Sequence, residues 1–413
     1  MKSRSQLFAS LSVAFAGLII EHFDVMLVNL FATSMTAHFF QPSSPSHLVV
    51  IGFLGYGISF VFRPLGAAFF GMMGDRIGRR QSMLVSLAVM SVATLLLGLI
   101  PSYAQIGMYS TLLFVICRIA QGMSVGGEYG AAMTYAFEAT QDRKTFSGSL
   151  MVSATHLGGL IATLLASRFT HGFQTAFIIA GIAGAVSLAF RSFMVETLPE
   201  KEKVSSFKEI FKTVIKDKTA FRKVFFIGAS LVFIFYSSLI YLNEVIFQEG
   251  LATREEIFVS NAFLLVLWMI LPAILGFAVD HYKMNYKKVM SYGCMGIVFL
   301  AFPVLRYTAE SLTFFHIFLA QLLISGIHAV FCFGTPRFIS EQFETGVRNT
   351  GVSFGYSLGA SFTAAATPLV CHGLVQGTQN ISVIAIPMAV LACFAALQLK
   401  APELKKSEVA YGR

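Results

Sequence analysis

Long apolar runs separated by short polar segments make up almost the whole chain. Each run approaches or exceeds the roughly 20 residues that an α-helix needs to cross a bilayer. The pattern therefore predicts an all-α membrane protein with twelve transmembrane helices. The predicted spans cover residues 8–37, 48–73, 82–100, 106–137, 145–168, 173–195, 222–247, 256–279, 288–306, 312–335, 350–373 and 379–399.

Composition agrees with this interpretation. Of the 413 residues, 56% are hydrophobic and only 12% are charged, whereas a typical soluble protein has roughly 25% charged residues. Five cysteines lie in or at the edges of apolar runs without the spacing of a metal site, so we expect them to pack. We expect neither a metal nor a cofactor, and no enzymatic activity. The cysteines are Cys117, Cys294, Cys332, Cys371 and Cys393.

The distribution of basic residues predicts the orientation in the membrane. The excess of 30 Lys and Arg over 21 Asp and Glu would indicate a nucleic-acid partner in a soluble chain. Here, however, most of the basic residues lie in the loops between the apolar runs. If the N-terminus is cytoplasmic, 24 of them fall in inner loops and tails, and only Arg168, Arg254 and Arg306 fall in outer loops. By the positive-inside rule both termini are cytoplasmic. We expect a monomer in the plasma (inner) membrane, in contact with lipids and without nucleic acid.

An arginine inside an apolar run is the first candidate for a functional residue. Arg118 and Gln121 share one face of the helix predicted over residues 106–137. An ionised group at bilayer depth costs several kcal/mol unless it faces a partner or a water-filled cavity. The pattern favours a substrate pathway lined by Arg118 and Gln121, and a permanent structural ion pair is the alternative.

Three carboxylates are predicted near this arginine. Glu21 and Asp24 are three residues apart on one helix, and Asp24 lies about as deep as Arg118. With Glu128, they would surround a single arginine and form a titrating, proton-coupling cluster. His156 in residues 145–168 is a further proton-carrier candidate, although a packed histidine is the more common case.

Aromatic side chains are candidates for lining a substrate site. At helical spacing such residues usually pack or form an interfacial belt, so each is only a candidate for contact with a small-molecule substrate. The candidates are Tyr56, Tyr236, Tyr241, Trp268 and Tyr356.

The segment after the second span has a distinctive spacing. Its glycine, aspartate and arginines predict a tight inner turn whose Asp75 can lie at the positive end of a facing helix. The pattern G-x-x-x-D-R-x-G-R-R resembles the loop signature of the major facilitator superfamily, and we predict that its residues gate the inner side. They are Gly71, Asp75, Arg76, Gly78, Arg79 and Arg80.

An internal repeat supports the same fold. Gly71 and Asp75 recur 205 residues later as Gly276 and Asp280, and Arg143 recurs as Arg348. We predict two similar six-helix halves, residues 1–195 and 222–413, with Asp280, Glu341 and Arg348 in the inner gate. Residues 196–221 form a linker with a capping-box pattern, Ser206 to Glu209, before an amphipathic helix expected on the inner membrane surface.

Several motifs together resemble one branch of this superfamily, the metabolite:proton symporters, which include carriers of proline and betaine, α-ketoglutarate, citrate and shikimate. The resemblance implies alternating access around a central site. Protonation of the carboxylates in residues 8–37 would free Arg118 for a substrate carboxylate. An exporter of the same fold and a non-transporting receptor or channel are the alternatives. The motifs are Arg63-Pro-Leu-Gly66, Arg118-x-x-Gln-Gly, Gly-Gly-Glu128, Glu21-x-x-Asp24 and residues 341–351.

Counting buried charges predicts the type of substrate. Only Arg118 is expected at the centre of the membrane, with Arg63 nearer the inner face. One arginine with several acidic and aromatic residues suits a zwitterion such as proline or a betaine. A di- or tricarboxylate such as α-ketoglutarate or citrate, or shikimate, remains the alternative.

Overall fold

The computed structural model describes residues 4–41, 45–140, 142–166, 172–204 and 206–401, and these residues form helices without any strand. Twelve helical segments in this part of the chain are long and apolar enough to cross a membrane. The predicted fold class, an all-α membrane protein with twelve transmembrane helices, is thereby confirmed.

The first part of the chain contains eight α-helices. Two of them, α2 and α5, are short and follow or precede a long helix. The helices are α1 (Arg4–Leu30), α2 (Ala32–Phe39), α3 (Pro45–Arg76), α4 (Arg79–Leu99), α5 (Tyr103–Ile106), α6 (Met108–Ala139), α7 (Lys144–Ala166) and α8 (Phe173–Arg191).

The second part follows two small linker helices, η1 (Glu200–Glu202) and α9 (Phe207–Lys216). The first of its six spans is interrupted by one π-helical segment, the fourth ends in a short α-helix, and the fifth and sixth each begin with a short 3-10 helix. The elements are α10 (Lys218–Phe235), the π-helix η2 (Tyr236–Tyr241), α11 (Leu242–Gln248), α12 (Arg254–His281), α13 (Tyr286–Glu310), α14 (Phe314–Cys332), α15 (Thr335–Glu341), η3 (Thr345–Val347), α16 (Arg348–Thr378), η4 (Ile381–Ile384) and α17 (Ala385–Lys400).

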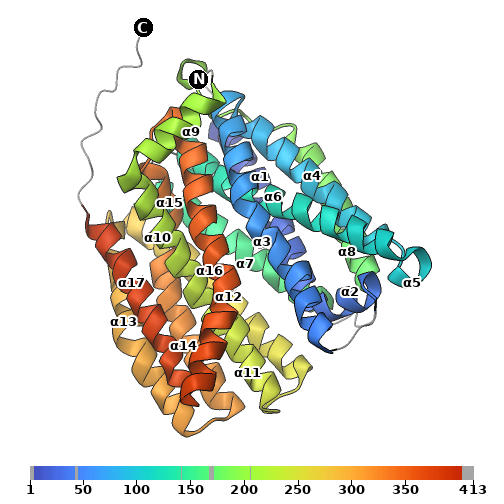
Figure 1. Cartoon of the computed structure of the whole chain (residues 1–413). Helices are drawn as coiled ribbons and strands as arrows, with labels where there is room; N and C mark the ends of the chain where they lie inside the picture. The colour runs from blue at the N-terminus through green and yellow to red at the C-terminus, as the bar shows by residue number, and fades with distance from the viewer. Residues whose placement is uncertain (1–3, 42–44, 141, 167–171, 205, 402–413) are drawn as a thin grey trace.

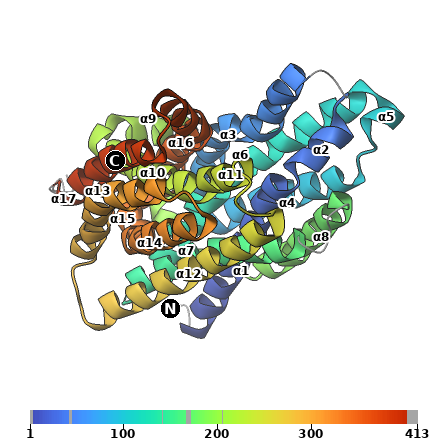
Figure 2. The same cartoon turned by 90° about the horizontal axis from the view of Figure 1, so that it is seen from below.

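The two groups of helices meet along two helix pairs, α3 with α16 and α7 with α12. We call the end of the bundle that holds α9, the start of α1 and the end of α17 the linker end. Helices α3 and α16 lie side by side at the linker end and diverge toward the opposite end (Figure 1). Viewed from below, these four helices lie between α13 and α17 on one side and α5 and α8 on the other (Figure 2).

Glycines allow α3 and α6 to pack with their backbones in contact. A Cβ on Gly126 would lie 2.0 Å from the backbone oxygen of Arg63, and one on Gly122 would lie 2.4 Å from that of Ser59. In the other direction, a Cβ on Gly66 would lie 2.0 Å from the backbone oxygen of Met123. Small residues of this kind let membrane helices approach closely, and here they bring Arg63 and Arg118 toward the same interior.

The linker helix α9 differs from its prediction in two respects. Ser206 occupies the N-cap position, but its side chain makes no capping hydrogen bond. Ile210 and Val214 on the apolar face are fully buried against α3, α10 and α16, so these two residues meet protein where lipid was expected. The helical period alone could not show whether protein or lipid covers this face.

Candidate functional site

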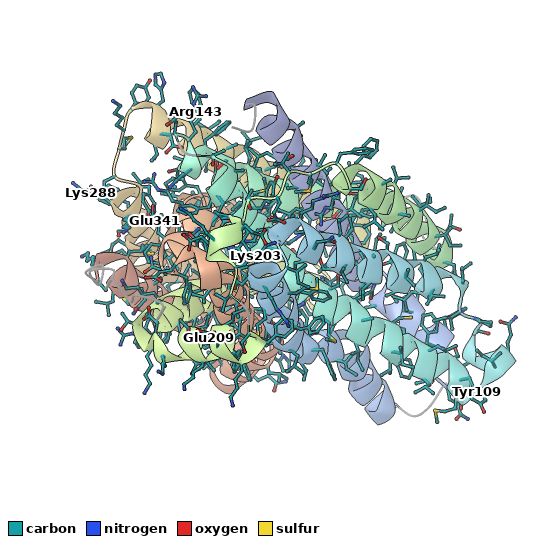
Figure 3. The ribbon with its side chains drawn as sticks, turned by 90° about the horizontal axis from the view of Figure 1, so that it is seen from above. Tyr109, Arg143, Lys203, Glu209, Lys288 and Glu341 are labelled. Carbon is teal, nitrogen blue, oxygen red and sulfur yellow. The ribbon has the colours of Figure 1, made fainter. Side chains whose placement is uncertain are left out.

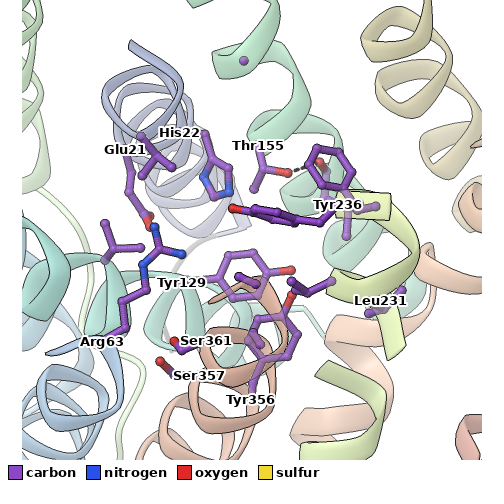
Figure 4. A pocket seen from close by; sticks show the side chains of 18 of the residues that line it. Glu21, His22, Arg63, Tyr129, Thr155, Leu231, Tyr236, Tyr356, Ser357 and Ser361 are labelled. Atoms are coloured by element: carbon purple, nitrogen blue, oxygen red, sulfur yellow. Dashed lines mark hydrogen bonds between the residues drawn. The ribbon is translucent and has the colours of Figure 1, made fainter. Parts of the chain in front are cut away.

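A cavity of about 190 Å³ lies between the two groups of helices. Side chains from α1, α3, α6 and α7 line it on one side, and residues of α10, η2, α14 and α16 line it on the other. Figure 4 shows that its polar and aromatic side chains converge on a common space. A concave site with a few convergent polar groups is the usual form of a small-molecule site.

An acidic and a basic side chain face each other on one wall of this cavity. Glu21 of α1 is 1% exposed, and neither of its carboxylate oxygens has a hydrogen-bond partner among the described residues. Arg63 of α3 lies over the ring of Phe60 at 4.1 Å, and its Nε also lacks a partner in this part of the chain. Figure 4 shows the guanidinium of Arg63 and the carboxylate of Glu21 pointing toward each other.

Aromatic and imidazole side chains form the rest of the wall. Tyr129 of α6 and Tyr356 of α16 stack across the two groups of helices with ring centroids 4.7 Å apart. Tyr236, the first residue of the π-helix η2, also lines the cavity. His156 of α7 also lines it, and its Nδ1 lies 2.8 Å from the backbone oxygen of Val152. His22 and His328 are further lining residues.

Asp24 lies in a small side pocket of about 10 Å³, next to the main cavity. Its carboxylate accepts hydrogen bonds from the hydroxyl of Thr94 at 2.6 Å and from Nε2 of Gln121 at 2.9 Å. Arg118 in turn donates to Oε1 of Gln121 at 2.7 Å and to the hydroxyl of Ser59 at 2.8 Å. Gln121 therefore joins the buried carboxylate of Asp24 to the guanidinium of Arg118.

The predicted cluster of three carboxylates around one arginine is wrong. Glu128 forms an ion pair with Arg191 and accepts a hydrogen bond from Ser86, and it is not among the residues that line either pocket. Arg191 ends α8 but is fully buried, because Gly17 leaves room for its guanidinium against α1. The carboxylates are thus shared among three arginines, Arg63, Arg118 and Arg191.

The gating candidates meet at the linker end. Oδ2 of Asp75 accepts hydrogen bonds from the backbone and hydroxyl of Thr350, and Oδ1 accepts one from the backbone of Asn349. Asp75 thus caps the N-terminus of α16, where the helix dipole favours a negative charge. Gly71 lies against the backbone of Thr350, since a Cβ there would be 2.8 Å from its Cα.

Buried ion pairs extend this contact. Arg79 bonds both Asp75, at 2.5 Å, and Glu138, at 2.9 Å, and Arg348 bonds Glu138 from the other group of helices, at 2.9 Å. Arg79 also donates to the backbone oxygen of Thr345. A carboxylate between two arginines joins the two groups of helices at the linker end.

The repeat position Asp280 makes the equivalent helix cap. Its Oδ2 accepts a hydrogen bond from the backbone of Phe146 in the first turn of α7. Arg337 lies 3.6 Å from Asp280 and 2.9 Å from Glu341. The 205-residue repeat therefore corresponds to two helix caps, one across each of the pairs α3–α16 and α12–α7.

The remaining loop residues organise the turn itself. Gly78 has φ +137°, and a Cβ there would meet the carboxylate of Glu196, which accepts hydrogen bonds from the backbones of Arg79 and Arg80. Arg76 stacks on the ring of Phe207 in α9, at 4.6 Å. Arg80 donates to the backbone oxygen of Ser192.

Comparison with known proteins identifies the family. The model of the Major Facilitator Superfamily matches residues 14–343. The chain belongs to the major facilitator superfamily. It is therefore a multi-pass membrane transporter and not an enzyme.

Three similar proteins illustrate the likeness. The chain is 26% identical over 411 residues to the proline/betaine transporter of Escherichia coli (strain K12), covering 93% of this chain and 81% of the relative. It is 28% identical over 401 residues to the inner membrane metabolite transport protein YhjE of the same strain, covering 91% and 89%. The solved proton:xylose symporter XylE, 16% identical, superposes with a TM-score of 0.76 over 96% of this chain and 95% of that one.

The aromatic candidates have different positions in this superfamily fold. Tyr236 and Tyr356 line the main cavity, whereas Tyr241 lies in the hydrophobic core of the second group of helices. Trp268 is fully buried behind the cavity wall, with its ring 5.4 Å from that of His156. The side chain of Tyr56 lies outside the described residues.

Arg63, Tyr129 and the π-helix η2 were not predicted as site elements. Arg63 lies nearer the linker end than Arg118, which bonds Ser59 one turn earlier on α3. Arg63 precedes the end of α3 by 13 residues, which places it roughly 20 Å from that end. The signal for Arg63 was present, because it is a charge inside an apolar run. Nothing in the sequence pattern indicated η2, although π-helical segments often occur at functional sites.

Proposed function

We propose that this transporter is a proton-coupled importer of a small zwitterion such as proline or a betaine. One arrangement carries the proposal. The buried carboxylate of Asp24 lines a side pocket next to the main cavity, and in that cavity Arg63 and Glu21 can present one positive and one negative charge. The first group can hold a proton, and the second pair matches a solute with both a carboxylate and an ammonium group.

Coupling follows from the chain of contacts at Asp24. When Asp24 is ionised, Gln121 is held by its carboxylate and in turn holds Arg118. A proton on Asp24 removes the charge that attracts the amide of Gln121 and changes the position available to Arg118, which lines the side pocket together with Arg63. A ligand that prefers one of the two arrangements shifts the population by its differential affinity.

The direction of transport depends on the orientation in the membrane. Figure 3 looks onto the linker end and labels charged side chains there, including Arg143, Lys203 and Lys288. With this end in the cytoplasm of a cell whose inner membrane holds the protein, the caps of Asp75 and Asp280 close the inner side. The arrangement then corresponds to the outward-facing state of an alternating-access carrier.

The charged residues in the main cavity support a zwitterion, but the arginine among them is Arg63 and not Arg118 as expected. Arg63 takes the position in the main cavity that the sequence assigned to Arg118, and Arg118 is engaged by Gln121 and Ser59. The relatives named proline/betaine transporter are in accord with this class. A dicarboxylate would need a second free cation in the same space. Shikimate, which has one carboxylate and no ammonium group, would leave Glu21 without a cationic partner.

Purified protein in proteoliposomes with an inward proton gradient tests the proposal. We expect uncoupler-sensitive accumulation of a zwitterion from a panel of proline, glycine betaine, α-ketoglutarate, citrate and shikimate. Accumulation of only the organic acids would overturn the substrate class and leave the symporter standing. Gradient-driven exit of substrates from the vesicles would instead favour the exporter.

A further inference from the structure

We infer that Glu21 is a substrate-binding residue rather than a proton carrier, and that with Arg63 it selects a zwitterion whose ammonium group keeps an N–H bond. This inference rests on the proposed function, because it describes how the same cavity distinguishes one zwitterion from another. It predicts a preference for a primary or secondary ammonium over a fully methylated betaine.

The two buried carboxylates of α1 differ in the hydrogen-bond donors that the protein supplies to them. Asp24 accepts hydrogen bonds from Thr94 and Gln121, so the protein itself supplies its donors. Glu21, one turn away, lines the main cavity with both oxygens unpartnered among the described residues. A buried acceptor without a donor is costly, and the cavity is the side from which a ligand can supply one.

Arg63 provides the opposite half of the site. Its guanidinium faces Glu21 in Figure 4, and Phe60 covers one side of it at 4.1 Å. The Nε of Arg63 is unpartnered within the described chain, and the planar guanidinium can hold a carboxylate through two parallel hydrogen bonds. A zwitterion placed between the two residues would present its carboxylate to Arg63 and its ammonium to Glu21.

Hydrogen-bond chemistry then separates the possible ligands. A primary or secondary ammonium donates N–H bonds to both free oxygens of Glu21. A quaternary ammonium donates none and leaves both oxygens without a hydrogen bond from the ligand. The facing sides of the Tyr129 and Tyr356 rings do not replace this contact, since the two rings stack on each other with centroids 4.7 Å apart. Hydrogen bonds to charged groups change affinity by roughly 10- to 100-fold.

A ligand series with one skeleton tests this without changing size greatly. L-proline, N-methyl-L-proline and N,N-dimethyl-L-proline carry two, one and no N–H bonds on the ammonium group. Binding is measured by thermal shift and by competition in counterflow, both without a proton gradient. We expect the half-saturating concentration to rise along the series, by about tenfold or more from the first compound to the last.

Two substitutions assign the effect to Glu21. Glu21→Leu should weaken proline binding to about the level of the dimethyl compound, which flattens the series. Glu21→Gln keeps the size and one acceptor, and should weaken proline binding about tenfold. The matched control is Glu244→Gln, since Glu244 is exposed on α11 and bonds only to Gln248 among the described contacts.

Three outcomes would overturn the inference. The dimethyl compound could bind wild-type protein as tightly as proline, which leaves the zwitterion transporter intact but removes the N–H selection. Glu21→Gln could bind proline normally yet fail to accumulate it under a proton gradient, which makes Glu21 the proton carrier. If none of the three compounds binds while a dicarboxylate does, the proposed substrate class fails together with the inference.

Discussion

Asp75 of α3 accepts two hydrogen bonds from Thr350 of α16: its Oδ2 lies 2.8 Å from the backbone nitrogen of Thr350 and 2.6 Å from its hydroxyl oxygen. A carboxylate from the first group of helices therefore caps a helix of the second. Both residues are buried, so solvent screening is weak and the contact opposes separation of the two groups at the linker end.

We predict that Asp75→Asn shifts the population toward the state open at the linker end. The substitution removes a negative charge from a helix N-terminus and from Arg79, a loss of about 1 to 3 kcal/mol for charge-assisted hydrogen bonds. Cys332 lines the cavity and reports the change. In a background lacking the other four cysteines, a membrane-impermeant thiol reagent applied from the linker side should label Cys332 faster.

Asp217→Asn is the matched control for this experiment. Asp217 also caps a helix, α10, but it accepts its hydrogen bond from Ala220 within the same group of helices. Its substitution should leave the labelling rate of Cys332 unchanged. Equal labelling of wild type and Asp75→Asn would show that this cap does not hold the linker end closed.

Neutralising Asp24 should separate coupling from transport. We predict that Asp24→Asn abolishes accumulation driven by a proton gradient while counterflow exchange of the substrate continues, because the main cavity keeps Arg63 and Glu21. Thr94→Val, which removes a donor to Asp24, should weaken coupling less. Thr163→Val is a matched control, since the hydroxyl of Thr163 bonds the backbone of Gly159. Accumulation at the wild-type level by Asp24→Asn would place coupling elsewhere, with His156 the next candidate.

The spans and the end-capping aspartate could be predicted because local signals determine them. The twelve spans can be recognised without knowing which helices are neighbours, because each helix makes its own backbone hydrogen bonds in lipid. The spacing of Gly71 and Asp75 is also a local signal. The glycine allows a close approach to a neighbouring backbone, and the aspartate one turn later can cap a neighbouring helix. The structure has Asp75 at the N-terminus of α16, where the sequence had predicted a facing helix.

The pairing of the buried charges could not be predicted, because it depends on which helices are neighbours. Their similar depth in the membrane predicted that Asp24 and Arg118 would be partners. In the structure the side-chain amide of Gln121 lies between them and bonds both. Arg191 is the last residue of α8, and it is fully buried because Gly17 on another helix leaves room for its guanidinium. For the same reason Glu128 was grouped with Arg118, whereas it pairs with Arg191.

Close packing of α3 on α6 makes Gly126 sensitive to the addition of a single methyl group. We predict that Gly126→Ala lowers stability by about 1 to 3 kcal/mol, the usual cost of overpacking, because the added Cβ would lie 2.0 Å from the backbone oxygen of Arg63. The measurement is the thermal unfolding midpoint in detergent. Gly373→Ala on α16, where nothing lies within 4 Å of the new Cβ, should leave the midpoint unchanged or raise it. Equal effects at both positions would contradict the close contact.

The buried pair of Glu128 and Arg191 should contribute to stability and not to coupling. Removing one partner of a buried ion pair leaves an uncompensated charge and typically costs about 3 to 5 kcal/mol. We therefore predict a large loss of thermal stability for Arg191→Met and for Glu128→Gln. The double variant should lose much less than the sum of the two, since neither charge is then left alone.

Transport by the same variants separates this pair from Asp24. Glu128 bonds Arg191 and Ser86 and is absent from the lining of both pockets, so a proton on it would not alter the contacts of Gln121 with Arg118. Glu128→Gln that folds, or the double variant, should therefore keep the wild-type ratio of gradient-driven uptake to counterflow. A ratio as low as that of Asp24→Asn would mean that protonation of Glu128 reaches the substrate cavity through α1, where Arg191 lies against Gly17 one turn from Glu21.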